Sequence, residues 1–81
     1  MKYTYKTKGT CSSLIELELE EGIVKEVAFV GGCNGNLQGI ASLIKGMPAK
    51  EVCKRLEGIK CGRRSTSCPD QLSQAIHEMG Y

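Results

Sequence analysis

The sequence predicts an α+β domain, in which a three-stranded antiparallel meander is followed by about three helices packed on one face of the sheet. Apolar and polar residues alternate strictly over 15–20, as in a strand with one buried face. Apolar residues recur at helical spacing after residue 36. Strands that come first and helices that come last are typical of an α+β fold. With 81 residues and 41% hydrophobic content, we expect a single domain over 1–81.

The first half of the chain predicts three strands. Tyr3 and Tyr5 alternate with polar residues in a short strand signal. The second strand covers 15–20, and its glutamates would form the solvated face, so this acidic run needs no catalytic role. A turn at 21–22 leads into a third strand over 23–30, which is rich in β-branched residues.

The second half of the chain predicts three helices. Apolar residues at helical spacing over 37–44 indicate a first helix directly after the glycine-rich loop 31–36. A second, short helix covers about 48–58. The third helix begins after Cys68, because Pro69 suits the first helical position and an apolar stripe follows it.

Composition excludes several classes of function. The net charge is +2, with 11 basic and 9 acidic residues interspersed, and only 5% of residues are aromatic, which argues against nucleic-acid binding. No apolar run approaches the length of a membrane span or a secretory signal, so we expect a soluble, cytoplasmic protein without a membrane partner. Five cysteines are an odd number, and without an export signal they predict reduced thiols rather than a disulfide framework.

Three of the cysteines occupy similar places in the predicted fold. Cys11 lies in a loop before a strand, Cys33 lies in the glycine-rich loop before a helix, and Cys68 lies at a helix start. The free N–H groups of a helix N-terminus stabilise a thiolate, which favours metal binding or nucleophilic chemistry. A single free cysteine is more often a small buried hydrophobe, and this is our interpretation of Cys53 on the apolar side of the second helix.

The leading hypothesis is a zinc ion or an iron–sulfur cluster bound by cysteines, because soft thiolate ligands select these metals. The candidate ligands are Cys33, Cys61 and Cys68, with Cys11 as a candidate fourth. Six residues separate Cys61 from Cys68, which is not the close pairing of a zinc knuckle, so the fold would have to assemble the site.

Two alternatives stay open. A pair such as Cys61 and Cys68 could cycle between dithiol and disulfide as a redox accessory of a reductase. Alternatively, backbone N–H groups of the glycine-rich loop and two arginines could bind a nucleotide or flavin phosphate. The candidate anion-binding residues are Gly32, Asn34, Gly35, Asn36, Arg63 and Arg64.

The sequence contains no group of residues that is arranged for acid–base catalysis. His77 falls with Asp70, Ser73 and Gln74 on the polar face of the third helix, which we expect to be solvated. No pair of carboxylates stands on an apolar helix face.

The segment 61–72 contains Thr66-Ser67-Cys68-Pro69-Asp70, and it resembles the signature of TSCPD-domain proteins. Together with the glycine-rich loop and its helix, the resemblance extends over nearly the whole chain. Members of this family occur alone and as the C-terminal domain of vitamin B12-dependent (class II) ribonucleotide reductases. The resemblance implies an accessory related to ribonucleotide reductase, with that or another reductase as its partner. A homodimer formed through a free strand edge is a further alternative that the sequence leaves open. A chain of 81 residues cannot contain the reductase barrel, so we do not expect it to reduce nucleotides alone.

A more distant similarity is to iron–sulfur cluster scaffolds of the NifU/IscU type, which also have a strand meander followed by helices. Their three cysteines occur in the order in which Cys11, Cys33 and Cys68 occur here. This chain has Ser13 and Ser67 where the scaffolds carry an acidic residue and a histidine, and the similarity leaves Cys61 as a substitute ligand.

Overall fold

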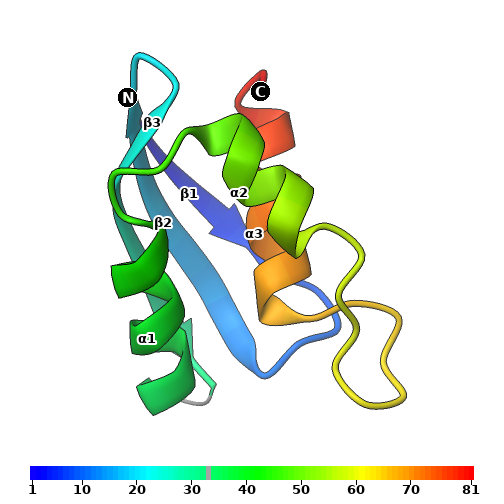
Figure 1. Cartoon of the computed structure of the whole chain (residues 1–81). Coiled ribbons are helices and arrows are strands. Elements are labelled where there is room, and N and C mark those ends of the chain that lie inside the picture. Colours follow the sequence, from blue (N-terminus) through cyan, green and yellow to red (C-terminus); the bar gives the residue numbers. More distant parts are fainter. Residues whose placement is uncertain (33) are drawn as a thin grey trace.

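A computed structural model describes residues 1–32 and 34–81 of the chain, and the side chains of these residues apart from that of Asn34. Three strands come first and three helices follow, as the sequence predicts (Figure 1). The strands are β1 (Lys2–Lys6), β2 (Ser12–Glu20) and β3 (Ile23–Gly31), and the helices are α1 (Asn34–Ile44), α2 (Ala49–Leu56) and α3 (Cys68–Glu78).

The strands form one antiparallel sheet in the order β1-β2-β3, so β2 is central. The alternation predicted for β2 is confirmed, since Ile15, Leu17 and Leu19 are buried while Glu16 and Glu20 are exposed. One face of the sheet therefore supplies the core, and the other carries charged side chains to solvent.

The helices cover the apolar face of the sheet. In Figure 1, α2 and α3 lie side by side near β1, and α1 runs beside β3. The buried apolar residues of sheet and helices form one cluster, to which α3 contributes Leu72, Ala75 and Ile76. Within the described residues, no helix is long and apolar enough to cross a membrane.

An irregularity at the start of β2 changes which side chains face the helices. The pairing with β3 shifts between Ser12 and Leu14. A strict alternation from Ile15 would turn Ser13 inward, but Ser12 is buried and Ser13 is exposed. A bulge of this kind re-aims a side chain at the end of a strand. Here it points Ser12 towards the helix layer.

Two predicted boundaries were wrong. The loop predicted over 31–36 is shorter, because α1 already begins at Asn34, so Gly35 and Asn36 lie in its first turn. Asn and Gly are acceptable at the start of a helix, and apolar packing of the following turns extends the helix backwards. The second strand begins at Ser12 rather than Ile15, because pairing with β3 continues through the bulge.

Candidate functional site

The N-terminus of α3 is capped by the residues just before it. Ser67 is the N-cap, and its hydroxyl accepts a hydrogen bond from the backbone N–H of Asp70 at 3.1 Å. The same hydroxyl donates to the carbonyl of Ile59 at 2.6 Å, which connects the cap to the preceding loop. Pro69 lies in the first turn, where its missing N–H costs no helical hydrogen bond. Cys68 is therefore held as the first residue of α3.

The carboxylate of Asp70 is buried and fully engaged. Its Oδ1 accepts from the backbone N–H of Gly58 at 2.8 Å, and its Oδ2 accepts from the Thr66 hydroxyl at 2.5 Å and from Gln74 Nε2 at 3.1 Å. Burial alone would raise the pKa of this carboxyl, but the hydrogen bonds outweigh burial and keep the pKa below its ordinary value of 3.8.

The prediction that Asp70 and Ser73 lie on a solvated face of α3 is wrong. Asp70 and Ser73 were placed on it, but they are 8% and 0% exposed. Asp70 is covered because the loop between α2 and α3 folds over it. The Ser73 carbonyl faces the core side of α2, where it accepts a hydrogen bond from the Cys53 thiol at 3.6 Å. His77 is exposed as predicted, with its Nε2 3.0 Å from Glu57 Oε1.

Gln71 connects α3 to the loop between β1 and β2. Its Nε2 donates to the Thr66 hydroxyl at 3.1 Å, while its Oε1 accepts from the backbone N–H of Lys8 at 3.0 Å. Arg64 adds a second connection, because its Nη1 donates to the Gly9 carbonyl at 3.2 Å. These contacts hold the loop that carries Cys11 against the start of α3.

The two sulfurs of Cys11 and Cys68 meet at this junction. Their Sγ atoms lie 3.9 Å apart, although 57 residues separate them in the chain. Cys68 is only 6% exposed, whereas Cys11 is exposed. Ser12 Oγ, turned inward by the bulge, lies 3.0 Å from Cys68 Sγ. The described part of the chain thus contains one pair of adjacent thiols with a hydroxyl beside it.

The surroundings of Cys68 favour its thiolate form. Burial raises the pKa of the Cys68 thiol, but hydrogen bonds from the Ser12 side chain and backbone, from Thr10 and from Cys11 together lower the pKa below its ordinary value. The N-terminus of α3 is a further source of stabilisation for negative charge. Burial has the opposite result at Cys53, where no such donors compensate and the pKa is raised.

Gly32 lies close to the sulfur of Cys11, the exposed residue of the cysteine pair. It has φ of +81°, and a Cβ at this position would lie 3.0 Å from Cys11 Sγ and 3.0 Å from Leu37 Cδ1. Glycine permits both the backbone conformation and the close approach. The segment that leads from β3 towards α1 therefore passes directly beside the sulfur of Cys11.

The other cysteines are distributed differently. Cys53 is buried in the core, as predicted. Cys61 is exposed in the loop before α3, where its backbone N–H donates to the Thr66 carbonyl at 3.1 Å. Cys33 lies outside the described residues. Among the residues that are described, no three His, Cys, Asp or Glu side chains gather into a group that could hold a metal, so Cys61 is not assembled with Cys11 and Cys68.

The candidate anion-binding residues do not form one cradle in the described structure. Gly32 lies at the sulfur pair, whereas Gly35 and Asn36 are exposed in the first turn of α1, where Asn34 is the first residue. Arg63 and Arg64 are exposed in the loop before α3, and Arg64 is engaged with a backbone carbonyl.

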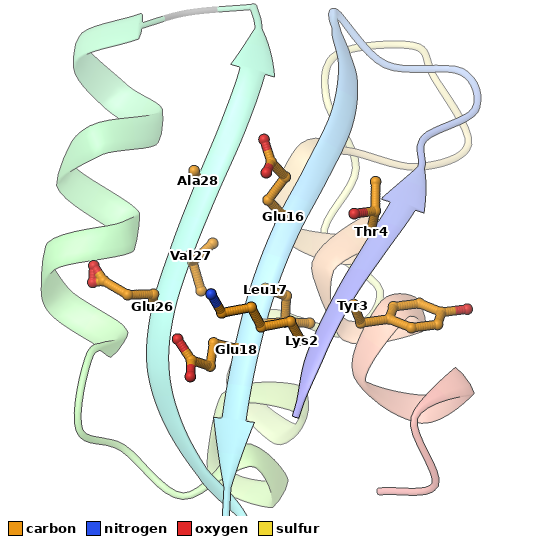
Figure 2. Close-up of a pocket in the computed structure, with 9 residues that line it drawn as sticks. All are labelled: Lys2, Tyr3, Thr4, Glu16, Leu17, Glu18, Glu26, Val27 and Ala28. Carbon is orange, nitrogen blue, oxygen red and sulfur yellow. The ribbon is translucent and has the colours of Figure 1, made fainter.

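A hollow of about 390 Å³ lies elsewhere, on the outer face of the sheet (Figure 2). Glu16, Glu18 and Lys2 project from the strands around it, while the helices lie behind or beside the sheet. Glu26 at its edge is paired with Lys45 at 3.3 Å. None of its lining residues is a cysteine, and its floor is the ordinary solvated face of a sheet. The sulfur pair is therefore the better candidate site.

Two features of this junction are not predicted from the sequence. Ser12 was not singled out, because its inward position depends on a bulge that the apolar pattern does not indicate. The capping role of Ser67 and Asp70 did have a sequence signal, since Ser-x-x-Asp at the start of an apolar helical stripe matches a capping-box pattern.

The family model described as TSCPD domain matches residues 1–80, which confirms the resemblance indicated by Thr66–Asp70. No curated protein matches the chain, and no solved structure matches it. The similarity to NifU/IscU scaffolds stays a prediction from the sequence.

Substitution Asp70→Asn tests the capping network. The lowered pKa means that Asp70 stabilises the fold above the unfolded-state pKa near 3.8, and that this stabilisation is lost as the pH falls through the lower folded-state pKa. We expect the free energy of unfolding of the variant to be about 1.5–3 kcal/mol lower than that of the wild type at pH 7. As the pH falls from about 5 to about 2, the variant should lose less stability than the wild type, because it has no carboxylate to protonate at this position. Urea unfolding measures both. Exposed Glu16→Gln is the control, and an equal effect there would contradict the account.

Substitution Gly32→Ala tests the close approach to Cys11. A methyl group would meet two neighbours at 3.0 Å with the backbone at positive φ, so we expect a destabilisation of about 1–3 kcal/mol. Gly46→Ala is the matched control, because Gly46 also has a positive φ, of +87°, while its added Cβ would meet no atom within 4 Å beyond its own chain neighbours. Urea unfolding compares the two variants, and equal stabilities would show that Gly32 is not constrained in this way.

Proposed function

We propose, from the premise that this chain belongs to the TSCPD-domain family, that it is a small metal-binding accessory module in which Cys11 and Cys68 are ligands of zinc or of an iron–sulfur cluster. TSCPD domains are associated with ribonucleotide reductase-like proteins. A reductase is accordingly the partner that we propose for the module.

The observation that carries this proposal is the separation of the two sulfurs. Two thiolates bound to one tetrahedral zinc ion at about 2.3 Å lie about 3.8 Å apart. The Sγ atoms of Cys11 and Cys68 lie 3.9 Å apart. The pair therefore has the spacing of two ligands on one metal, and binding would require little rearrangement of either side chain.

The electrostatic surroundings support the same function. Metal binding requires a deprotonated thiol, and the hydrogen bonds around Cys68 lower its pKa. Ser12 would act as the outer partner that orients the ligand sulfur, as hydrogen-bonded groups commonly do around metal sites. Sulfur donors favour zinc and iron over magnesium or calcium, which prefer oxygen.

A thiolate pair alone leaves coordination positions open. Cys33 directly follows Gly32 in the chain, and Gly32 lies against Cys11 Sγ. We propose Cys33 as the third ligand on this ground, although its own position is outside the described residues. Cys61 is the remaining candidate, because its loop is joined to the cap of α3. The anion-binding alternative has less support, since its residues are dispersed.

The metal content of the anaerobically purified chain tests the proposal. We expect close to one zinc ion, or the iron of one cluster, per site, together with a visible spectrum if iron is present. Cys11→Ser and Cys68→Ser should each reduce the bound metal about tenfold or more, because each removes a direct ligand. Elemental analysis after gel filtration measures the content, and the same analysis of Cys33→Ser and Cys61→Ser identifies the further ligands.

Cys53→Ala is the matched control, because this thiol is buried in the core away from the pair. It should keep the full metal content despite a loss of stability. Wild-type protein that contains no metal and takes up none on anaerobic reconstitution would contradict the proposal.

A further inference from the structure

We propose that, in the metal-free protein, Cys11 and Cys68 form a reversible dithiol–disulfide couple that exchanges with the disulfide of a thiol partner through Cys11, the exposed residue of the two. This activity goes beyond metal binding and does not require it. It also differs from the pair Cys61 and Cys68 considered from the sequence, because the cysteine whose sulfur lies 3.9 Å from Cys68 Sγ is Cys11.

The geometry allows the disulfide to form. A disulfide bond is about 2.05 Å long, so the two sulfurs, now 3.9 Å apart, must approach by about 1.9 Å. Cys11 lies in a loop and is exposed, so its side chain has room to turn towards Cys68. Cys68 is fixed by the cap of α3 and stays in place.

Unequal access assigns different roles to the two sulfurs. An incoming disulfide needs a sulfur that it can approach in line, and Cys11 is exposed while Cys68 is 6% exposed. Cys11 is therefore the entry thiol, and Cys68 is the resolving thiol that attacks from inside the protein.

The exchange balances as two successive displacements. The Cys11 thiolate attacks one sulfur of the partner's disulfide, whose S–S bond breaks and releases the first partner thiolate. The Cys68 thiolate then attacks Cys11 Sγ in the mixed disulfide and releases the second partner thiolate. The protein loses two electrons and two protons in total, and the partner disulfide gains them to become two thiols. The reverse sequence reduces the pair.

Ser12 influences the direction of this exchange. In the reverse reaction the Cys11–Cys68 bond breaks and leaves negative charge on Cys68 Sγ, 3.0 Å from the Ser12 hydroxyl. A hydrogen bond to this charge stabilises the reduced form of the couple. Ser13 provides a matched comparison, because it is the next residue but its hydroxyl donates to the Val30 carbonyl on the exposed side.

Equilibration with glutathione and glutathione disulfide tests the proposal. The full chain carrying Cys33→Ser and Cys61→Ser, stripped of metal with a chelator, is titrated anaerobically and analysed by intact mass and peptide mapping. We expect a single intramolecular Cys11–Cys68 cross-link that is lost as the fraction of reduced glutathione rises. The same cross-link in wild-type protein would show that it does not depend on the two background substitutions.

Two further variants separate the roles of the sulfurs. Adding Cys68→Ser should trap one glutathione on Cys11, because no resolving thiol remains. Adding Cys11→Ser should leave Cys68 unmodified over the same time while the protein is folded, as judged by circular dichroism. Rapid modification of Cys68 in this folded variant, or a stable mixed disulfide in the parent instead of the cross-link, would overturn the proposal.

Ser12→Ala gives a readout that a merely structural pair would not show. We expect the equilibrium to shift about tenfold towards the disulfide, because the hydrogen bond to the charged sulfur is lost, whereas Ser13→Ala should leave the equilibrium unchanged. Equal shifts in both variants would contradict the role of Ser12. This test uses metal-free protein, so a protein that forms the cross-link but takes up no metal would uphold the couple and contradict only the metal site.

Discussion

The buried carboxylate of Asp70 is the contact on which the arrangement of the site depends. It accepts hydrogen bonds from the backbone of Gly58 and from the Thr66 hydroxyl, which belong to the two ends of the loop before α3. The adjacent Gln71 extends the same network to Lys8 in the loop between β1 and β2. A buried, satisfied polar network of this kind specifies a single arrangement of the segments that it joins. The two segments that carry Cys11 and Cys68 are thereby held together.

The residues Thr66–Asp70 divide into two kinds. Four of them have structural explanations: Thr66 and Asp70 close the loop, Ser67 caps α3 and Pro69 occupies its first turn. The side chain of Cys68 contributes instead to the sulfur pair, where the Ser12 hydroxyl lies 3.0 Å from Cys68 Sγ and helps to lower the pKa of the thiol. Two adjacent cysteines can bind a soft metal through their sulfurs or form a disulfide by exchange with a partner's disulfide, and a bound metal would occupy the sulfurs that exchange requires. The two proposals thus describe two states of one site.

Much of the fold could be predicted from the sequence, because it follows from local patterns. The alternation around Ile15 and the helical stripe around Leu72 indicate β2 and α3, and the position of Cys68 at the start of α3 follows from Pro69. The partner of Cys68 could not be predicted in this way. The approach of Cys11 depends on the loop contacts of Gln71 and on the bulge at Ser12, which are tertiary features. Asp70 was misplaced for a similar reason, since a distant loop covers it.

X-ray absorption at the metal edge of the loaded protein tests the metal site most directly, because it counts sulfur ligands around the ion. We expect a first shell dominated by sulfur at about 2.3 Å for zinc, with one sulfur fewer in Cys11→Ser and in Cys68→Ser. A first shell made only of nitrogen and oxygen, or the same sulfur count in the wild type and both variants, would contradict the assignment of this pair as metal ligands.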